Sequence, residues 1–314
     1  MGLTSHALPE DCGGGGARSA VTQALMAEEL ACGDLALALA ILSPLLLSLP
    51  LADYGSDAQK QRYLPGLAGP DFRPGALAVA EPRFDSDALR PRTRARPEGK
   101  GYVLDGVKCL VPWLEGVPCV GVVAQDEDGP QIFLVDAEAE GLRAEPAQYM
   151  GLRALPLVEL QLESVRLPRS ARLGEGAGSD VAAILARGRV GLAALATGVA
   201  RAAFELARDY AKQRETFGAP IATRQSIAFL LADLATEIDG LRLLTWEAAW
   251  RLDRGEDARR EAALASQQAQ RVVLEAADGA VQIFGGHGYV REYLPELLLR
   301  NAGGFAGFEA LTLV

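Results

Sequence analysis

The spacing of hydrophobic positions along this chain changes twice. Residues 19–75 have a mostly helical period, which predicts a helix from Ser19 to Gly33 with Ser19 as its N-cap. An amphipathic helix is predicted from Ala58 to Leu67 and should end at Pro65-Gly66. From about Gly75 the pattern shortens to β-prone runs separated by Gly, Pro and Asp clusters. These runs are Ala76–Ala80, Tyr102–Leu104, Val117–Ala124, Gln131–Val135 and Val158–Leu162.

Long periods rich in Ala and Leu return after Gly178. They predict helices over roughly 179–212, 221–254, 257–284 and 291–304. Helices on both sides of a strand-rich segment indicate an α+β chain with three parts. We expect N-terminal helices over residues 1–75, a central β-domain over 76–175 and a C-terminal four-helix bundle over 176–314.

One apolar stretch has the length of a membrane span. Residues 35–52 carry no charge over eighteen positions, which meets the crude requirement for crossing a bilayer. Pro44 and Pro50 interrupt the stretch, so a pair of buried helices with a break at Ser43-Pro44 explains it better. The first residues lack the basic segment of a secretory signal. We therefore expect a soluble, cytoplasmic protein with no membrane partner.

Composition narrows the classes of function. The chain has 314 residues, of which 49% are hydrophobic and 23% charged, as in globular proteins. Its 31 basic and 41 acidic residues give a formal charge of −10, which argues against nucleic acid as a partner. The four cysteines lack C-x-x-C spacing, which indicates reduced thiols. Two histidines are too few for a histidine-based metal site, so we expect no metal.

The candidate chemistry lies near the end of the chain. Gln282 begins the run Gln-Ile-Phe-Gly-Gly-His-Gly-Tyr, whose Gly285-Gly286 pair lets the backbone approach a ligand closely because neither residue has a Cβ. Glu309 follows about twenty residues later between apolar neighbours. Such neighbours suit a desolvated carboxylate whose pKa is raised towards that of a working base. Each feature alone is weak, because glycine pairs also cap helices and glutamates also lie on helix surfaces.

A second motif strengthens the first. Upstream the chain reads Arg214-Glu215-Thr216-Phe217-Gly218-Ala219-Pro220-Ile221, followed by Gln225. Together the two motifs resemble the acyl-CoA dehydrogenase family, whose C-terminal half reads R-x-x-F-G-x-P-I then Q, later Q-x-x-G-G-x-G-Y, and finally R-D-A ahead of a catalytic E-G-T. The order and spacing match down to Glu309, and agreement in several parts is more specific than any single motif. The chain resembles a short, divergent member of this family.

The resemblance implies a reaction. The family removes two hydrogens from Cα and Cβ of an acyl thioester, carried on CoA or on acyl carrier protein, with FAD as oxidant and electron-transferring flavoprotein as acceptor. Glu309 matches the family's base for the α-proton, and the β-hydrogen leaves as hydride to the flavin N5. Glu81 and Glu247 are the next candidates if Glu309 is not the base. Such a weakly acidic proton requires a desolvated base and hydrogen bonds that polarise the thioester carbonyl.

The resemblance also implies binding residues. Six positions match family contacts to the adenosine half of an FAD that a neighbouring subunit holds: Arg214, Phe217, Gln225, Gln282, Gly285 and Gly286. A guanidinium suits a pyrophosphate and a phenyl ring suits adenine. Ser86, Arg189 and Ala310 match positions on the substrate side. His287, between the glycines, is expected to be a capping or core residue.

The chain departs from the family pattern beside the flavin ring. Ala80 stands where the family has Thr, and Val111-Pro112 stands for Ile-Thr in its second flavin strand. Proline offers neither a backbone N–H nor a hydroxyl, so hydrogen bonding near the flavin should change. Ala310-Leu311 replaces the Gly-Thr that follows the base. The chain also starts some 50 residues later than the family usually does and has five residues after Glu309.

These departures leave two readings of the function. The first is an FAD-dependent enzyme that dehydrogenates an acyl thioester. The second is a non-catalytic or half-active subunit that lends its FAD contacts to a paralogue. Both imply a homo- or hetero-oligomer. We also expect apolar surface to be exposed along the helices of residues 35–52 and of residues 221–254, as at an interface.

Overall fold

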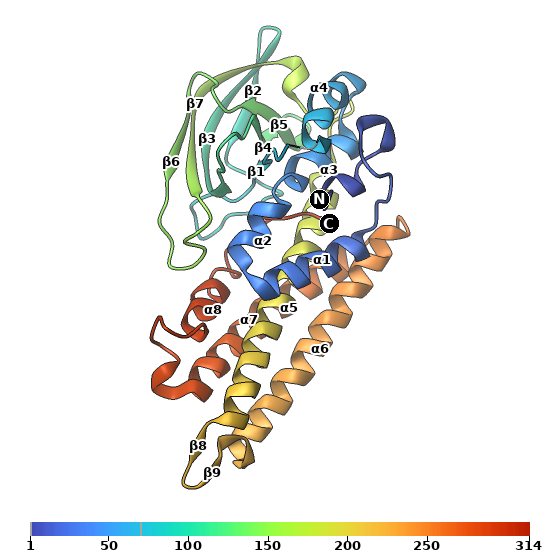
Figure 1. Cartoon of the computed structure of the whole chain (residues 1–314). Helices are drawn as coiled ribbons and strands as arrows, with labels where there is room; N and C mark the ends of the chain where they lie inside the picture. Colours follow the sequence, from blue (N-terminus) through green and yellow to red (C-terminus); the bar gives the residue numbers. More distant parts are fainter. Residues whose placement is uncertain (1, 70) are drawn as a thin grey trace.

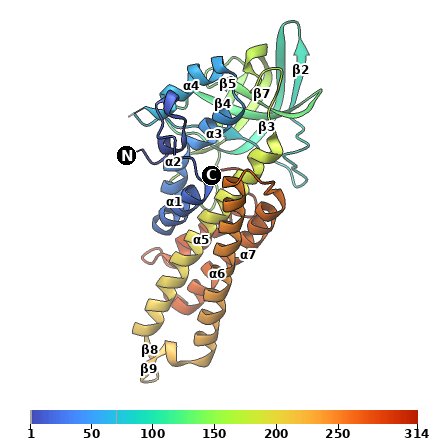
Figure 2. The same cartoon turned by 90° about the vertical axis from the view of Figure 1, so that its right-hand side faces the viewer.

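The computed structural model describes residues 2–69 and 71–314. A seven-stranded sheet lies at one end of the molecule, and three long helices extend away from it (Figures 1 and 2). The N-terminal helices pack at the junction between the sheet and these long helices. The order of helices, strands and helices confirms the predicted α+β fold.

The N-terminal region is helical. Its helices are α1 (Ala20–Gly33), α2 (Leu35–Leu42), α3 (Leu45–Tyr54) and α4 (Asp57–Ala68). The predicted cap is confirmed, since the Thr22 amide donates to Ser19 Oγ. The predicted end of α4 at Pro65-Gly66 is wrong, because the helix continues to Ala68 with Pro65 inside it. Burial of Leu64 and Leu67 outweighs the one hydrogen bond that the proline removes.

The apolar stretch forms the predicted pair of buried helices, α2 and α3, separated at Ser43-Pro44. By length and composition alone, Leu35–Tyr54 and Val181–Gln213 could each cross a membrane, but 78% and 72% of their apolar windows are buried inside the protein. Both are therefore core helices. The expectation of exposed surface along residues 35–52 is wrong except at Leu37. Helix α2 packs on α1 and on the long helix α5 (Val181–Gln213), and α3 packs on α4 and on strand β1 (Ala76–Ala78).

The β-domain contains seven strands in the order β1-β4-β2-β3-β7-β6, with β5 paired to β4. They are β1 (Ala76–Ala78), β2 (Arg94–Glu98), β3 (Gly101–Pro112), β4 (Cys119–Asp126), β5 (Gly129–Asp136), β6 (Leu142–Pro146) and β7 (Leu157–Pro168). The five predicted runs all contain strands. Strands β2 and β6 were not predicted, because most of their side chains are exposed or half-buried and they lack an apolar run.

The C-terminal region consists of α5 (Val181–Gln213), α6 (Gln225–Asp253), α7 (Arg259–Phe284) and the short α8 (Pro295–Ala302). A hairpin of β8 (Glu215–Thr216) and β9 (Ala219–Pro220) joins α5 to α6 at the end of the bundle farthest from the sheet (Figure 1). The predicted helix over 221–254 begins later, at Gln225, because Ile221–Thr223 forms a 3-10 turn. The fourth helix is only eight residues long, and α1 also packs on α5 and α6.

Helix α6 carries the exposed apolar surface that its sequence predicted. Phe229, Leu243 and Trp250 are 60%, 63% and 50% exposed, and Trp246 is 36% exposed. Positions 243, 246 and 250 are three and four residues apart, so they share one face of the helix. A face of large apolar side chains on an otherwise polar helix surface is typical of an interface.

Candidate active site

Glu309 lies on the segment that follows α8 and passes beside α5. Its Oε1 is 3.5 Å from Nη2 of Arg189 on α5, and its side chain is about a third exposed. Its Oε2 is buried and has no hydrogen-bond partner among the described residues. A carboxylate with one oxygen beside a cation and the other buried without a donor is oriented and free to accept a proton.

The residue after Glu309 has an unusual backbone conformation. Ala310 has φ +47°, in the left-handed region that favours glycine, and is almost fully buried. It packs against Gly188 of α5, where a Cβ would lie 2.9 Å from that of Ala310. The family's glycine at this position therefore corresponds to a real backbone requirement that Ala310 meets under strain. Thr312 carries a hydroxyl one position beyond the family's Thr, and its Oγ1 is buried without a partner within the described chain.

A small apolar cavity opens beside the segment that carries Glu309. Its volume is about 290 Å³, and Leu110, Tyr149, Leu157, Gly304 and Phe308 are among the residues that line it. A β-bulge between Lys108 and Val111 interrupts the pairing of β3 with β7, and Leu110 has φ +56° there. Bulges of this kind re-aim side chains next to binding sites. The cavity therefore offers a flat ligand apolar walls from both the β-domain and the C-terminal segment.

The sheet brings together the predicted flavin-side residues. The Cys109 amide donates to the Ala80 carbonyl at 2.9 Å, which joins the end of β1 to the strand that carries Val111 and Pro112. Val111 and Pro112 are buried and pair with Val158 and Leu157 of β7. Only their backbone can face a ligand, and Pro112 has no N–H to offer.

A buried ion pair that the sequence did not reveal holds these two segments in register. Lys108 Nζ donates to Glu81 Oε1 at 3.1 Å and to the Val79 carbonyl at 2.9 Å. Lys108 is fully buried and Glu81 nearly so. The sequence did contain one indication of this ion pair, because a lysine within the apolar run of β3 is buried and a buried charge requires a partner.

The ionisation of this pair also excludes Glu81 as a base. Burial lowers the pKa of Lys108 to about 8, although the Glu81 carboxylate opposes the change. Burial alone would raise the pKa of Glu81, but hydrogen bonds from Thr93 and the Lys108 ammonium outweigh it and hold the pKa below its ordinary value. Both oxygens of Glu81 also accept backbone hydrogen bonds, from Thr93 and Arg92. Glu247 is exposed on α6 and pairs with Arg251, so neither alternative carboxylate is placed for proton abstraction.

Ser86 lies in the exposed loop that follows Glu81. The Glu81 amide donates to Ser86 Oγ at 3.1 Å. This hydrogen bond ties the predicted substrate residue to the segment that also carries Ala80. Its exposure leaves the hydroxyl hydrogen available to a ligand.

The second group of predicted residues lies at the far end of the bundle. Phe217 and Gly218 form the β8–β9 turn with φ +51° and +78°, the combination of a two-residue type I′ turn. Phe217 is almost fully exposed, and a bulky residue with positive φ is strained, as at many ligand sites. Arg224 supports the turn through a hydrogen bond to the Thr216 carbonyl. Arg214 is exposed and forms no ion pair within the described residues.

The double glycine lies beside Tyr210 in the last part of α5, which leads into this turn. Gln282, Gly285 and Gly286 are exposed at the end of α7, and Gly285 has φ +58°. Phe284 stacks on Tyr210 of α5 with ring centroids 3.9 Å apart, four residues before Arg214. The Tyr210 hydroxyl is 3.0 Å from Nδ1 of His287, so the histidine is a packing residue of the loop. A Cβ on Gly285 or Gly286 would meet no atom within 4 Å, which leaves an open surface for a ligand.

The two groups of residues are far apart within one chain. Arg189 and Arg214 are separated by 25 positions of α5 and its C-cap, which corresponds to roughly 37 Å at 1.5 Å per residue. Because Glu309 pairs with Arg189, it lies near one end of α5, and the β8–β9 hairpin lies at the other end (Figures 1 and 2). A single ligand in one chain would have to extend along most of this helix to contact both.

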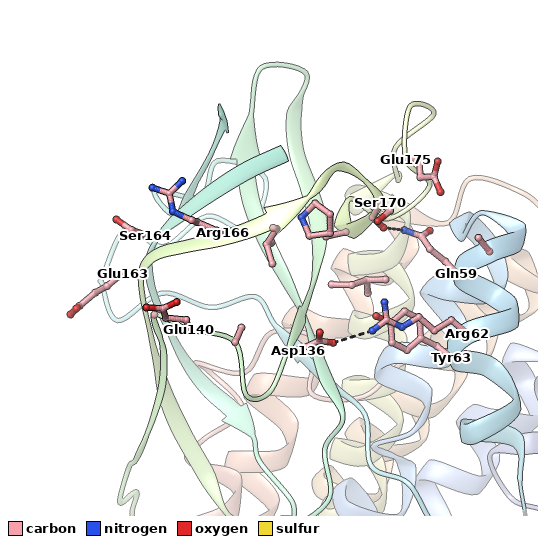
Figure 3. A pocket seen from close by; sticks show the side chains of 17 residues that line it. Gln59, Arg62, Tyr63, Asp136, Glu140, Glu163, Ser164, Arg166, Ser170 and Glu175 are labelled. Carbon is pink, nitrogen blue, oxygen red and sulfur yellow. Dashed lines mark hydrogen bonds and ion pairs between the residues drawn. The ribbon is translucent and has the colours of Figure 1, made fainter. Parts of the chain in front are cut away.

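A larger cavity of about 730 Å³ lies between α4 and the β-domain (Figure 3). None of the predicted site residues lines it. Its polar side chains have structural partners: Gln59 Nε2 donates to the carbonyls of Ser170 and Arg172, Arg62 pairs with Asp136, and Arg166 pairs with Glu98. The cavity is therefore a groove between domains rather than the site of the predicted chemistry.

The rest of the described chain adds no second reactive centre. Within residues 2–69 and 71–314, no cluster of three or more His, Cys, Asp or Glu side chains could hold a metal ion. The four cysteines are free thiols. Burial raises the pKa of the Cys119 thiol to about 12, which keeps it protonated and unreactive.

Three family models match consecutive parts of the chain. Residues 1–70 match the acyl-CoA dehydrogenase N-terminal domain, residues 76–165 the middle domain, and residues 174–309 the C-terminal domain. The matched residues extend to Glu309. Together they cover almost the whole sequence.

Individual proteins agree with the family models. A probable acyl-CoA dehydrogenase of Bacillus subtilis is 36% identical over 313 residues, which cover 96% of this chain and 82% of that protein. The butyryl-CoA dehydrogenase structure from Megasphaera elsdenii has a TM-score of 0.88 at 32% identity and covers 98% of this chain and 83% of its own. A glutaryl-CoA dehydrogenase of Mycobacterium smegmatis, solved in complex with FADH2, has a TM-score of 0.86 at 29% identity, with coverage of 98% and 79%.

Proposed function

The chain belongs to the acyl-CoA dehydrogenase family and is a flavoenzyme with FAD as its cofactor, and from this premise we propose that Glu309 is its catalytic base. The substrate is an acyl thioester, from which Glu309 removes a proton at Cα. The observation that carries the proposal is the buried, unpartnered Oε2 of Glu309, the residue that follows Phe308 in the wall of the apolar cavity. A buried acceptor without a donor costs free energy, so its retention is explained by a use.

Arg189 orients the base in this proposal. Its guanidinium lies 3.5 Å from Oε1 of Glu309 and so favours one position of the carboxylate. The base thus presents Oε2 to the substrate without first rearranging. Ser86, which is tied to the Glu81 segment, is placed to donate a hydrogen bond to the arm that carries the acyl group.

The residues around the apolar cavity fit a flavin ring. FAD supplies the chemistry of accepting the β-hydrogen as hydride when it is bound. Leu110, Leu157 and Phe308 would contact the faces and edges of the ring, and Gly304 and Gly307 have no side chain to obstruct it. The backbone near Ala80 and Val111 would border the ring, with Pro112 unable to donate there.

The adenosine half would be bound by a second chain. The separation of roughly 37 Å along α5 supports a contact across an interface, because Arg214 and Glu309 lie near opposite ends of this helix. The exposed apolar face of α6 supports the same assembly. In such an oligomer Arg214 pairs with the pyrophosphate of the neighbour's FAD, and Phe217 lies against the adenine. Electron-transferring flavoprotein is the acceptor in this proposal, as in the family.

The test is Glu309→Gln, which keeps the shape of the side chain and removes the proton acceptor. We expect turnover of an acyl-CoA with a dye acceptor to fall by about four decades with flavin content unchanged. Glu247→Gln, an exposed glutamate on α6, is the matched control and should retain full activity. If Glu309→Gln kept more than about a tenth of the activity, the carboxylate would have no role as the base. If the pure wild-type chain bound no FAD without a paralogue, the half-active-subunit reading would replace this one.

A further inference from the structure

Four arginines form a row on the surface of the β-domain. Arg90, Arg92, Arg94 and Arg96 alternate along the segment that leads into β2, and all four are exposed. We call them the arginine row. The residues between them, Pro91, Thr93 and Ala95, are buried. Alternation along a strand places every second side chain on one face, so Arg94 and Arg96 share the outer face of β2, and Arg90 and Arg92 continue the exposed positions into the bends that precede it.

The row is held rigidly from its inner side. The Thr93 amide and hydroxyl both donate to Glu81 Oε1 at 2.8 Å, within the buried network of Lys108. Proline follows both Arg90 and Arg96, and a following proline favours an extended backbone in the residue before it. A preformed row loses less conformational freedom when it binds a partner than a flexible segment does.

The charge of the row contrasts with that of the whole chain. Residues 84–100, which include the adjoining loop, contain five basic residues and three acidic ones, whereas the protein has a formal charge of −10. Arg92 pairs with Asp85 and Arg96 pairs with Asp105, but these exposed pairs are weak. Arg90 and Arg94 form no ion pair within the described residues. The row is therefore a local positive surface with two unused cations.

A fully exposed aromatic side chain lies in the adjoining loop. Phe84 is two residues from Ser86, and its neighbour Asp85 pairs with Arg92 of the row. An apolar ring in open solvent beside arginines matches the composition of interface hot spots, in which aromatic residues and arginine predominate. The loop thus joins the candidate substrate residue to the arginine row.

We propose that Phe84 and the arginine row dock an acyl carrier protein, an acidic protein that presents the acyl group as a thioester on a phosphopantetheine arm. This inference rests on the proposed function, because it uses the same substrate site. The arm would pass Ser86 towards Glu309, and acidic side chains of the carrier protein would pair with Arg90 and Arg94.

The shape of the row favours a protein over a nucleotide. The row runs over seven residues from Arg90 to Arg96, of which the last three lie in β2. The phosphates of CoA form a compact group that could engage only part of such a row, whereas an acidic helix can follow its whole length. Electron-transferring flavoprotein is less suited than a carrier protein, because the row adjoins Ser86, where the thioester arm is expected.

The experiment compares two forms of one substrate. Arg90→Glu with Arg94→Glu reverses the two unpaired charges and should raise KM for a butyryl-loaded acyl carrier protein by about tenfold or more, while kcat/KM for butyryl-CoA stays unchanged. Phe84→Ala should raise the same KM by about tenfold. Arg259→Glu with Arg260→Glu, two exposed arginines at the start of α7, makes the same change of charge and should leave both substrates unaffected.

Three outcomes would overturn the proposal. The first is an equal loss of kcat/KM for butyryl-CoA, which would show that the arginine row binds the nucleotide part of CoA. The second is a decrease only in the rate of reoxidation by electron-transferring flavoprotein, which would show that the arginine row binds that partner. The third is the absence of salt-sensitive binding between the wild-type protein and labelled holo acyl carrier protein without an acyl group. That binding measurement needs no turnover, so it separates failure of docking from failure of the proposed function.

Discussion

The two ends of α5 present polar residues in opposite ways. At the end near the sheet, charged groups are buried or half-buried and form ion pairs, as in Lys108 with Glu81 and Arg189 with Glu309, although Oε2 of Glu309 has no partner among the described residues. At the far end, Arg214, Phe217 and the double glycine are exposed and almost without partners. The far end is nevertheless well ordered by its turn and by the stacking of Tyr210 on Phe284.

The difference separates two kinds of binding surface. A site whose charged groups form ion pairs within the chain depends on the stability of that chain. A site whose groups are held in place but unsatisfied depends on a ligand or partner that arrives from outside. Substitutions near the sheet should therefore change the free energy of unfolding, whereas substitutions at the far end of α5 should change the affinity for a ligand or partner.

The largest effect is expected for Lys108→Met. This change leaves the Glu81 carboxylate buried without its cation, which should lower the free energy of unfolding by about 3–5 kcal/mol. Adding Glu81→Gln removes the orphaned charge and should recover much of the loss. Urea unfolding of the single and double variants measures both the loss of stability and its recovery. A single variant as stable as the wild type would contradict the assignment of the pair as buried and coupled.

The same pair predicts a pH dependence. In the wild type the pKa of Glu81 lies below its ordinary value of 4.5, so its contribution to stability is present above pH 4.5 and is lost as the pH falls through the lowered pKa. In Lys108→Met, burial without the ammonium raises that pKa, so this variant gains stability as acid protonates Glu81. The difference in the free energy of unfolding between the wild type and Lys108→Met should therefore become smaller from pH 7 to about pH 4.5. A difference that does not change with pH would contradict this prediction.

A smaller effect is expected at the end of α5 far from the sheet, and it should concern only the affinity for FAD. Arg214→Ala should weaken FAD binding by about one to two decades, through loss of a charge-assisted hydrogen bond of about 1.5–3 kcal/mol. The urea midpoint should not move, because Arg214 is exposed and unpaired among the described residues. Arg260→Ala is the control, with a guanidinium that is 82% exposed on α7. Unchanged FAD affinity would remove Arg214 from the cofactor site.

Mixing variants tests whether the two ends serve different chains. An Arg214→Ala chain keeps its base, and a Glu309→Gln chain keeps its arginine. If Arg214 reaches a neighbour's FAD, unfolding and refolding the two together should restore up to about a quarter of wild-type activity, because one site in each mixed dimer is intact. If the arginine served its own chain, the mixture would have no more activity than the separate variants.

The smallest effect is expected for Ala310→Gly. Glycine removes the left-handed strain at φ +47°, and we expect a gain of about 0.5–1 kcal/mol in the free energy of unfolding. Ala186→Gly, in the second turn of α5, is the matched control and should cost about 1 kcal/mol. Thermal unfolding compares the two. A loss of stability in both variants would mean that the backbone at Ala310 is not strained.

The sequence predicted the features that arise from repeated patterns. The helices of the C-terminal region were predicted to within about four residues because their apolar period extends over several turns. The core of the sheet was found because strands such as β4 are continuous apolar runs. Strands β2 and β6 were missed because pairing with β3 and β7, rather than their own composition, makes them strands.

The candidate site was predictable only where a motif is local. Glu309, Arg214 and Gly285 belong to short motifs that can be matched position by position. Whether the chain brings Lys108 to Glu81 depends on the register of β3 against the end of β1, which no local pattern specifies. The strain at Ala310 likewise became visible only as a backbone angle, although the family's glycine at that position suggested it.

The length of α5 has a consequence for the divergence of this protein. Arg189 and Arg214 sit on one continuous helix, so each inserted or deleted residue between them would rotate one end by about 100° relative to the other and shift it by about 1.5 Å. Changes of about 7 or 11 residues would nearly restore the phase, but they would move the far end by at least 10 Å. Substitutions can therefore accumulate freely along the exposed positions of α5, whereas its number of residues between the two arginines should be almost fixed.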